Sequence, residues 1–189
     1  RLKSIFRAAP VGIGLAVNRK FIQVNEHLSR LVGRSGDSLV GLDTRAVYAD
    51  DSDYELVGRE IYRLTEQGET ATVETRWADG DGKVIDVLLS CAPIDLEGPE
   101  TGVTFTALDI TARKKSETAL RESEEKFRTL FETSYDAIML LDPERGYQDC
   151  NPTALKMFAI PAKEILGQIS PATLSPERQF NGLLSSDAA

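Results

Sequence analysis

The feature that most constrains the fold is an internal repeat with a spacing of about 126 residues. Residues 5–17 and 130–142 each place a Leu/Ile-Phe pair before a short break and an apolar segment. Six of the next seven marker positions agree in character with the residues 126 places earlier, and the exception is Leu155 opposite Ser29. The markers are Asn151, Leu155, Met157, Phe158, Ile165, Leu166 and Gly167. A repeat this long does not fit a solenoid, so it indicates two domains of one kind.

The first copy predicts a definite order of secondary-structure elements. Apolar patterns and turn residues predict strands over 12–17 and 20–24, helices over 26–32, 36–40 and 51–67, and strands over 70–78, 83–95 and 101–109. The long helix has one apolar face, because Tyr54, Val57 and Ile61 recur at spacings of three and four. The segment Asp79–Gly82 is a strong hairpin signal. The order predicts an α+β module, in which a five-stranded antiparallel sheet carries its helices on one face.

Composition narrows the class of partner. The chain of 189 residues has 22 basic and 30 acidic residues, for a formal net charge of -8. An acidic chain repels phosphate backbones and anionic lipid surfaces, so we expect neither nucleic acid nor a membrane as a partner. Two cysteines, Cys91 and Cys150, fall in predicted strands of different domains and make no disulfide framework or zinc site. A reducing cytoplasm therefore suits the chain best.

The segment between the two copies, residues 111–129, is a charged helix. Acid-first pairs at i,i+4 support it, with Glu117/Arg121, Glu122/Lys126 and Glu124/Arg128 as the examples. Thr111 is the predicted N-cap. Leu120 and Phe127 lie seven residues apart and form a thin apolar seam. Two interpretations stay open, a solvated connecting helix and a parallel coiled coil in a homodimer.

Several short motifs occur in an order that resembles the PAS superfamily in its bacterial sensory-box form. They are the strand pair ending in Asn25, Leu39-Val40-Gly41, Asp81-Gly82-Lys83, Pro93-Ile94, Asp109-Ile110-Thr111 and Glu122-Ser123-Glu124-Glu125-Lys126-Phe127-Arg128. The resemblance implies a PAS fold that senses a ligand or partner and passes strain to an output domain. Family members commonly precede histidine kinase or cyclic-di-GMP (diguanylate cyclase) modules, and neither output is present in this segment.

The resemblance divides the chain into a complete PAS domain at 1–110, a signalling helix at 111–129 and a partial second PAS domain at 130–189. The chain opens with Arg1, so we expect it to be a piece of something longer. The second copy lacks its three closing strands, and we expect it to be artificially shortened or partly disordered. Two strands alone cannot bury a sheet face or satisfy their edges.

A pocket between sheet and helices is the expected ligand site, although plain core packing explains the same side chains. The candidate lining residues are Asn25, Leu28, Tyr48, Tyr62, Trp77, Leu89, Cys91 and Phe105. The expected occupant is an unidentified small organic molecule, because ligand pockets are apolar with a few polar groups. The expected relay residues are Asp109, Ile110, Thr111, Leu120 and Phe127. The resemblance gives Asp109 a role in tying the last strand to the exit helix.

No cofactor or metal is expected. The resemblance implies that a haem would need a histidine on the 51–67 helix, whereas the sole histidine is His27. It also implies that a flavin would need an Asn-Cys-Arg-Phe-Leu-Gln type motif, and Cys91 is instead an inert strand thiol. A haem- or flavin-bearing light or redox sensor stays open as the alternative. Gly12 and Gly14 belong to a strand rather than a dinucleotide loop, and Asp79–Gly82 is a turn rather than a calcium loop. No nucleophile–base pair can be assembled, and nothing positions Asp50 and Asp51 for catalysis, so the segment is not an enzyme.

Overall fold

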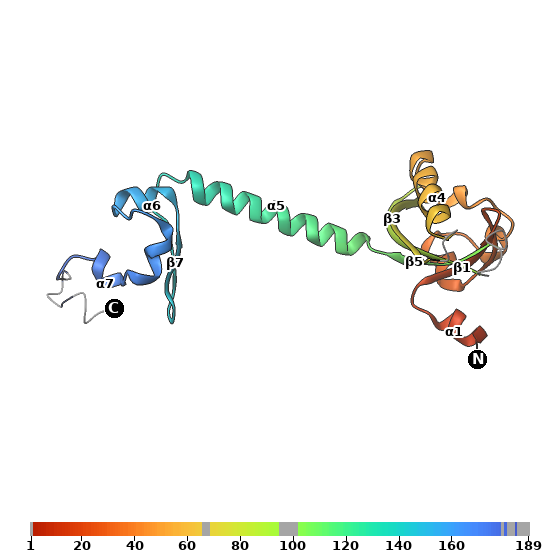
Figure 1. Ribbon diagram of the computed structural model, residues 1–189, viewed down its shortest axis with the longest axis horizontal. Helices are drawn as coiled ribbons and strands as arrows, with labels where there is room; N and C mark the ends of the chain where they lie inside the picture. The colour runs from red at the N-terminus through yellow and green to blue at the C-terminus, as the bar shows by residue number, and fades with distance from the viewer. Residues whose placement is uncertain (1, 66–68, 95–101, 179, 181–183, 185–189) are drawn as a thin grey trace. The chain divides into compact units, whose positions relative to one another are not determined.

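The computed structural model describes residues 2–65, 69–94, 102–178, 180 and 184, and it divides into two compact units. The first unit covers Arg1–Glu117 and the second covers Thr118–Ala189. Each unit is described by itself below. Figure 1 shows the elements that the two units contain.

The first unit is built on one five-stranded antiparallel sheet. Its strands are β1 (Gly12–Val17), β2 (Lys20–Val24), β3 (Ala71–Ala78), β4 (Val84–Pro93) and β5 (Val103–Asp109). They are ordered β2-β1-β5-β4-β3, so the chain crosses from one edge of the sheet to the other between β2 and β3. Every pairing is antiparallel, which confirms the predicted sheet. The predicted strand ends at residues 95 and 101, and the predicted helix end at residues 66–67, lie outside the described residues.

The crossover carries the helices of the first unit. After α1 (Leu2–Ala8) and the first hairpin come α2 (Glu26–Leu31), α3 (Gly36–Leu39), the 3-10 helix η1 (Thr44–Val47) and α4 (Asp51–Thr65). Side chains on alternate strand positions are buried, and they pack in one core with apolar residues of these four helices. Large members of this core include Phe21, Leu28, Leu39, Val57, Trp77 and Phe105. The helices α2, α3, η1 and α4 therefore cover one face of the sheet, as the sequence predicts.

The two asparagines of the repeat perform the same structural task in each copy. Asn25 Oδ1 accepts hydrogen bonds from the backbone N–H groups of Ile13 and Leu28, at 3.0 Å and 2.9 Å. Asn151 Oδ1 accepts from the backbone N–H groups of Ile138 and Ala154, at 3.0 Å and 2.9 Å. Each asparagine therefore caps a helix and ties it to the preceding hairpin, which explains its place in the repeat.

The second unit contains the end of α5 (Thr111–Thr133) and five shorter elements. These are β6 (Met139–Asp142), β7 (Gly146–Cys150), α6 (Pro152–Met157), the 3-10 helix η3 (Lys163–Gln168) and α7 (Pro171–Leu174). Its two strands pair antiparallel, and a small core gathers around Cys150 and Leu166. Lys163 joins α5 to this core, because its Nζ lies 3.4 Å from Glu132 and 2.8 Å from Asp149.

The start of α5 corrects one prediction. Thr111 is the first helical residue and not the N-cap. Its hydroxyl accepts a hydrogen bond from the backbone N–H of Asp86 on β4, at 2.9 Å. The side chain that caps the helix start is Asp109, whose Oδ1 accepts from the Thr111 N–H at 2.8 Å. Threonine is a common cap, and only the position of β4 shows that its hydroxyl is used elsewhere.

Candidate ligand-binding site

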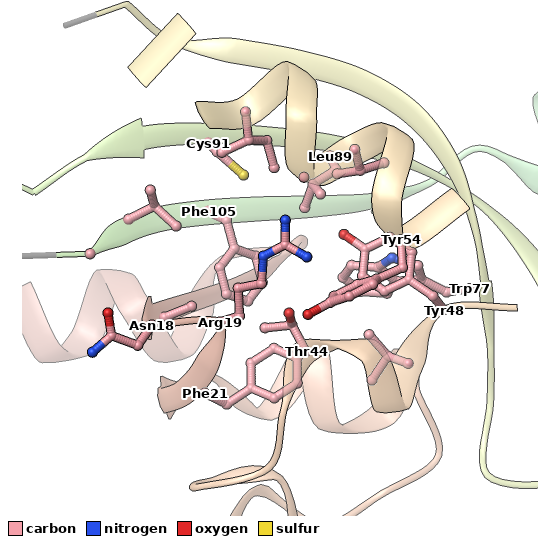
Figure 2. A pocket seen from close by; sticks show the side chains of 17 residues that line it. Asn18, Arg19, Phe21, Thr44, Tyr48, Tyr54, Trp77, Leu89, Cys91 and Phe105 are labelled. Atoms are coloured by element: carbon pink, nitrogen blue, oxygen red, sulfur yellow. The ribbon is translucent and has the colours of Figure 1, made fainter. Parts of the chain in front are cut away.

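A cavity of about 620 Å³ lies in the first unit between the sheet and the helices η1 and α4. Its size is within the usual range of pockets for small organic ligands. Most of the lining is apolar or aromatic, with a few polar groups (Figure 2). The lining residues are Ala16, Asn18, Arg19, Phe21, Thr44, Val47, Tyr48, Tyr54, Val57, Gly58, Ile61, Trp77, Leu89, Cys91, Gly102, Val103 and Phe105.

Arg19 comes from the tight turn between β1 and β2. Asn18 and Arg19 both have positive φ, at 49° and 58°, as a two-residue hairpin turn of the primed type requires. The Arg19 carbonyl accepts a hydrogen bond from the Thr44 N–H at 2.7 Å, which holds the turn against η1. The guanidinium reaches in among the lining side chains, and its Cζ lies 4.5 Å from the centroid of the Tyr54 ring (Figure 2).

Tyr48 and Trp77 form one wall of the cavity. An isolated antiparallel bridge joins them, and their rings meet edge to face with centroids 6.0 Å apart. Burial raises the pKa of the Tyr48 hydroxyl, the Cys91 thiol adds to this, and the neighbouring Trp77 and Arg19 side chains oppose it. Trp77 is 2% exposed, and its side chain is near enough to the Tyr48 hydroxyl to lower the Tyr48 pKa, although its Nε1 has no acceptor in good hydrogen-bond geometry within the described part of the chain.

The opposite wall consists of strand residues. Phe21 on β2 and Phe105 on β5 pack against each other, with ring centroids 5.9 Å apart. Cys91 on β4 lies opposite Phe105 across the strand pair, and burial raises the pKa of its thiol to about 12. A thiol with so high a pKa stays protonated and is a poor nucleophile. This wall therefore offers apolar contact rather than reactive chemistry.

Five of the eight predicted pocket residues line the cavity: Tyr48, Trp77, Leu89, Cys91 and Phe105. Asn25 and Leu28 do not line it. Asn25 is buried, and its amide also donates to the carbonyls of Phe6 and Val11, so backbone groups occupy both ends of the side chain. Leu28 is buried in the core on α2. The side chain of Tyr62 lies outside the described residues, and His27 is half-buried on α2, away from the lining.

Sequence reasoning missed the contribution of α4 and of the first hairpin. Arg19 was expected to be a turn residue, and Tyr54, Val57 and Ile61 were expected to be an apolar helix face. Gly58 offered a usable signal. Glycine within a helix is unfavourable, so an isolated one often indicates that another group approaches closely. Here that group is Arg19, because a Cβ added to Gly58 would lie 1.9 Å from the Arg19 Nη2.

Three strands that line the cavity also hold the first turn of α5. On β4, Asp86 donates its N–H to Thr111 and accepts a hydrogen bond from the Ile110 N–H at 2.9 Å. On β3, Glu74 lies 2.9 Å from both the Arg113 and the Lys114 side chains. On β5, Asp109 caps the helix, and Ile110 after it is buried. The predicted relay residues Asp109, Ile110 and Thr111 are thus brought together with two further strands.

The other two predicted relay residues lie farther along α5 and are exposed. Leu120 is 62% exposed and Phe127 is 56% exposed, although Phe127 stacks on Phe131 with ring centroids 5.6 Å apart. The ion pairs along the helix are Arg113–Glu117 and Arg121–Glu125, at 3.7 Å and 3.9 Å, in place of the three predicted pairs. In both pairs the base precedes the acid, which is the weaker orientation.

A metal site and a membrane-spanning helix are two further possibilities. Among the described residues, no group of three or more His, Cys, Asp or Glu side chains is placed to hold a metal ion. Within the same part of the chain, no helix combines the length and the apolar character needed to cross a membrane.

Two family models match this chain. A model described as "PAS fold" matches residues 6–115, which include the whole five-stranded sheet and the start of α5. A model described as "PAS domain" matches residues 125–186, which include β6, β7 and the short helices after them. The first matched region covers more than half of the chain, so the chain belongs to the PAS family.

Curated relatives are signalling proteins. The sensor protein TdiS of Thauera aromatica is 28% identical over 126 residues, which cover 67% of this chain and 23% of that protein. Sporulation kinase A of Bacillus subtilis is 23% identical over 133 residues, which cover 70% of this chain and 22% of that protein. The chain therefore spans less than a quarter of the length of either relative.

Solved structures share the fold. A PAS domain of a LuxR-family transcriptional regulator from Burkholderia thailandensis, in complex with ethanol, has a TM-score of 0.54 and 18% sequence identity. The match covers 58% of this chain and 97% of that one. At this identity the likeness establishes the arrangement of strands and helices.

Proposed function

We propose, because this chain belongs to the PAS family, that it is the sensory input region of a signal-transduction protein. In this proposal the first domain binds a small molecule in its cavity, and the resulting shift of its strands is passed to α5. The observation that carries the proposal is a cavity of about 620 Å³ whose lining strands also hold the first turn of α5. The relatives TdiS, a sensor protein, and sporulation kinase A support a kinase as the output.

The relay follows from shared strands. Leu89 and Cys91 on β4 line the cavity, and Asp86 on the same strand is bonded to Thr111. On β3, Trp77 lines the cavity and Glu74 forms an ion pair with Lys114 of the helix. A ligand that shifts these strands by a small amount must also move the helix start. A partly buried hydrogen bond from the Asp86 backbone and the ion pairs of Glu74 hold this junction together, so that in this proposal it transmits the shift rather than absorbing it.

The proposal includes two PAS domains in tandem, a homodimer and a cytoplasmic location. The exposed apolar side chains of α5 at Leu120, Phe127 and Leu130 support pairing of this helix with a second copy, since pairing would remove them from water. Two buried free cysteines suit a reducing compartment. The segment has no assigned catalytic group and is proposed to act without enzymatic activity of its own.

Native mass spectrometry of the full chain tests the proposal, because it reports a co-purified ligand and the oligomeric state together. We expect a dimer carrying a small organic molecule. If the protein is monomeric and binds no member of a broad metabolite panel, the sensing proposal is wrong. A visible absorption band in the purified protein would favour the alternative, a haem- or flavin-bearing sensor of the same fold.

A further inference from the structure

We propose that the cavity of the first domain takes a small organic acid, whose carboxylate pairs with Arg19 while its apolar body packs against the aromatic walls. This inference rests on the proposed sensing function and names the chemical class of the ligand. Three observations support it: the backbone position of Arg19, the space that Gly58 leaves for its guanidinium, and the charge of the lining.

The backbone directs Arg19 into the cavity. Positive φ is uncommon for residues other than glycine, and here Asn18 and Arg19 adopt it in succession at 49° and 58°. The hydrogen bond from the Thr44 N–H to the Arg19 carbonyl holds this turn beside η1. Because this bond joins the hairpin to the helix, it holds the Arg19 backbone in place. Figure 2 shows the Arg19 side chain extending from there among the lining residues.

Gly58 provides the space that the guanidinium occupies. A Cβ at this position would lie 1.9 Å from the Arg19 Nη2 and 2.8 Å from its Cζ. A side chain of any kind at position 58 would therefore push the guanidinium away from its place beside the Tyr54 ring. A glycine in the interior of a helix is unfavourable by itself. Its presence is explained if the position of Arg19 matters to the cavity.

The lining is cationic. Among the described residues that line the cavity, Arg19 carries the single formal charge, and none is Asp or Glu. The exposed Asp43 accepts a hydrogen bond from the Tyr54 hydroxyl at 3.1 Å, but it lies outside the lining. Charge interactions are stronger in a partly enclosed apolar cavity than in water. A guanidinium also presents a planar pair of donors that matches a carboxylate.

The apolar part of the lining suits the body of such an acid. Trp77 lines the cavity beside Tyr48, but its Nε1 is buried, so the residue offers the face of its ring rather than a donor. The remaining lining, including Phe21, Val57 and Phe105, would contact an aromatic or aliphatic body.

Binding experiments on the full chain test the inference with acids and their neutral amides. The probes are phenylacetate and octanoate, compared with phenylacetamide and octanamide, and the readout is isothermal titration calorimetry. We expect the acids to bind roughly ten- to a hundredfold more tightly than the matching amides, the range expected for a charge-assisted hydrogen bond. Arg19→Gln should remove most of this difference, because it weakens the binding of the acids more than that of the amides.

Gly58→Ala is a second variant with an independent reason. The added methyl group displaces the guanidinium without removing its charge, and alanine favours the helix, so the domain should stay folded while acid binding weakens. Arg59→Gln is the matched control, because Arg59 is an exposed residue next to Gly58 that does not line the cavity. Its acid binding should equal that of the unmodified chain. Circular dichroism melts of all three variants report folding.

The possible failures are distinguishable. If acids and amides bind equally, or if Arg19→Gln keeps the preference for acids, the anion inference is wrong while sensing of a neutral molecule stands. If the chain binds neither class, the result counts against both the inference and the proposed sensing function. Tight binding of acids that persists in Gly58→Ala would show that the position of the guanidinium does not matter.

Discussion

The hydroxyl of Thr111 accepts a hydrogen bond from the backbone N–H of Asp86, at 2.9 Å. The bond joins the first residue of the long helix α5 to the strand that carries Leu89 and Cys91 on the cavity wall. In the opposite direction, the Ile110 N–H donates to the Asp86 carbonyl at 2.9 Å. Asp86 therefore holds the junction through both of its backbone polar groups, and changes to this junction should separate domain stability from helix attachment.

Thr111→Val should loosen the junction. Valine keeps the shape of threonine and removes the acceptor, which leaves the partly buried Asp86 N–H without a partner at a cost of about 1–3 kcal/mol. We expect a small fall in the melting temperature and faster hydrogen exchange of the Asp86 amide. Thr104→Val, at an exposed position of β5, is the control and should change neither quantity. Unchanged exchange at Asp86 would contradict the role given to Thr111.

Asp109→Ala should uncouple signal from response in the protein to which this segment belongs. The Asp109 carboxylate accepts from the Thr111 N–H at 2.8 Å, and loss of such a cap typically costs about 1 kcal/mol. That amount is small for domain stability but comparable to a typical coupling free energy of about 1–3 kcal/mol. Asp109→Asn keeps an acceptor oxygen and is the matched control. A mutant that melts normally and responds fully to the signal would show that the junction is a passive connector.

Acid should weaken the attachment of α5 through Glu74. The Lys114 ammonium, together with Arg113, holds the pKa of the Glu74 carboxyl below its ordinary value of 4.5. A lowered pKa in the folded state stabilises the fold above the unfolded-state value, and this contribution is lost as the pH falls through the folded value. We therefore expect the first turn of α5 to lose protection against amide exchange, measured relative to the unfolded chain at the same pH, as the pH falls below about 4.5. Glu74→Gln should show that lower protection already at neutral pH and little further change with acid.

Salt provides an independent check on the same ion pairs. These side chains are largely exposed, so added salt should screen them. The exchange difference between the unmodified chain and Glu74→Gln should shrink between low salt and about 1 M salt. A difference that is constant with salt would mean that Glu74 acts through packing instead of charge.

Gly14→Ala should destabilise the first domain. A Cβ on Gly14 would lie 2.3 Å from the Phe105 Cζ, and the ring cannot retreat easily because it packs on Phe21. Overpacking of this kind costs about 1–3 kcal/mol, measurable by urea denaturation. Phe105→Leu should recover part of that loss in the double variant, since the clash disappears. Additive effects of the two changes would contradict direct contact between them.

Much of the fold could be predicted because its strands and helices are indicated by short-range sequence patterns. Turn residues and alternating apolar positions mark each strand of the first domain, and spacing marks α4. The lining of the cavity was harder to predict, because Arg19 and Gly58 are 39 positions apart and their contact depends on how the hairpin packs against the helix. Thr111 was misjudged for a related reason. Its hydroxyl has two possible partners, and the choice depends on β4, a strand distant in sequence.

The Cys91 thiol should be unreactive in the folded protein. Burial raises its pKa from 9.0 to about 12, so that almost no thiolate is present at neutral pH. In a Cys150→Ala background, iodoacetamide should label Cys91 only as fast as the first domain opens, and urea should accelerate labelling. The raised folded-state pKa also fixes the direction of a pH effect. The stability that the neutral thiol contributes is fully present below about pH 9 and is lost as the pH rises toward about 12.

The pKa of the buried Tyr48 hydroxyl is also raised, so two variants are needed to separate the contributions of Tyr48 and Cys91 to the pH dependence of stability. Cys91→Ala and Tyr48→Phe should each reduce the fall of the free energy of unfolding between pH 9 and pH 11, measured by urea denaturation. Both substitutions remove a titrating group from the lining of the cavity. Rapid labelling of Cys91 in the native state at pH 8 would mean that the thiol is accessible and ionised. In that event the cavity wall would be open to water, and the thiol would be a candidate for redox chemistry instead of apolar contact.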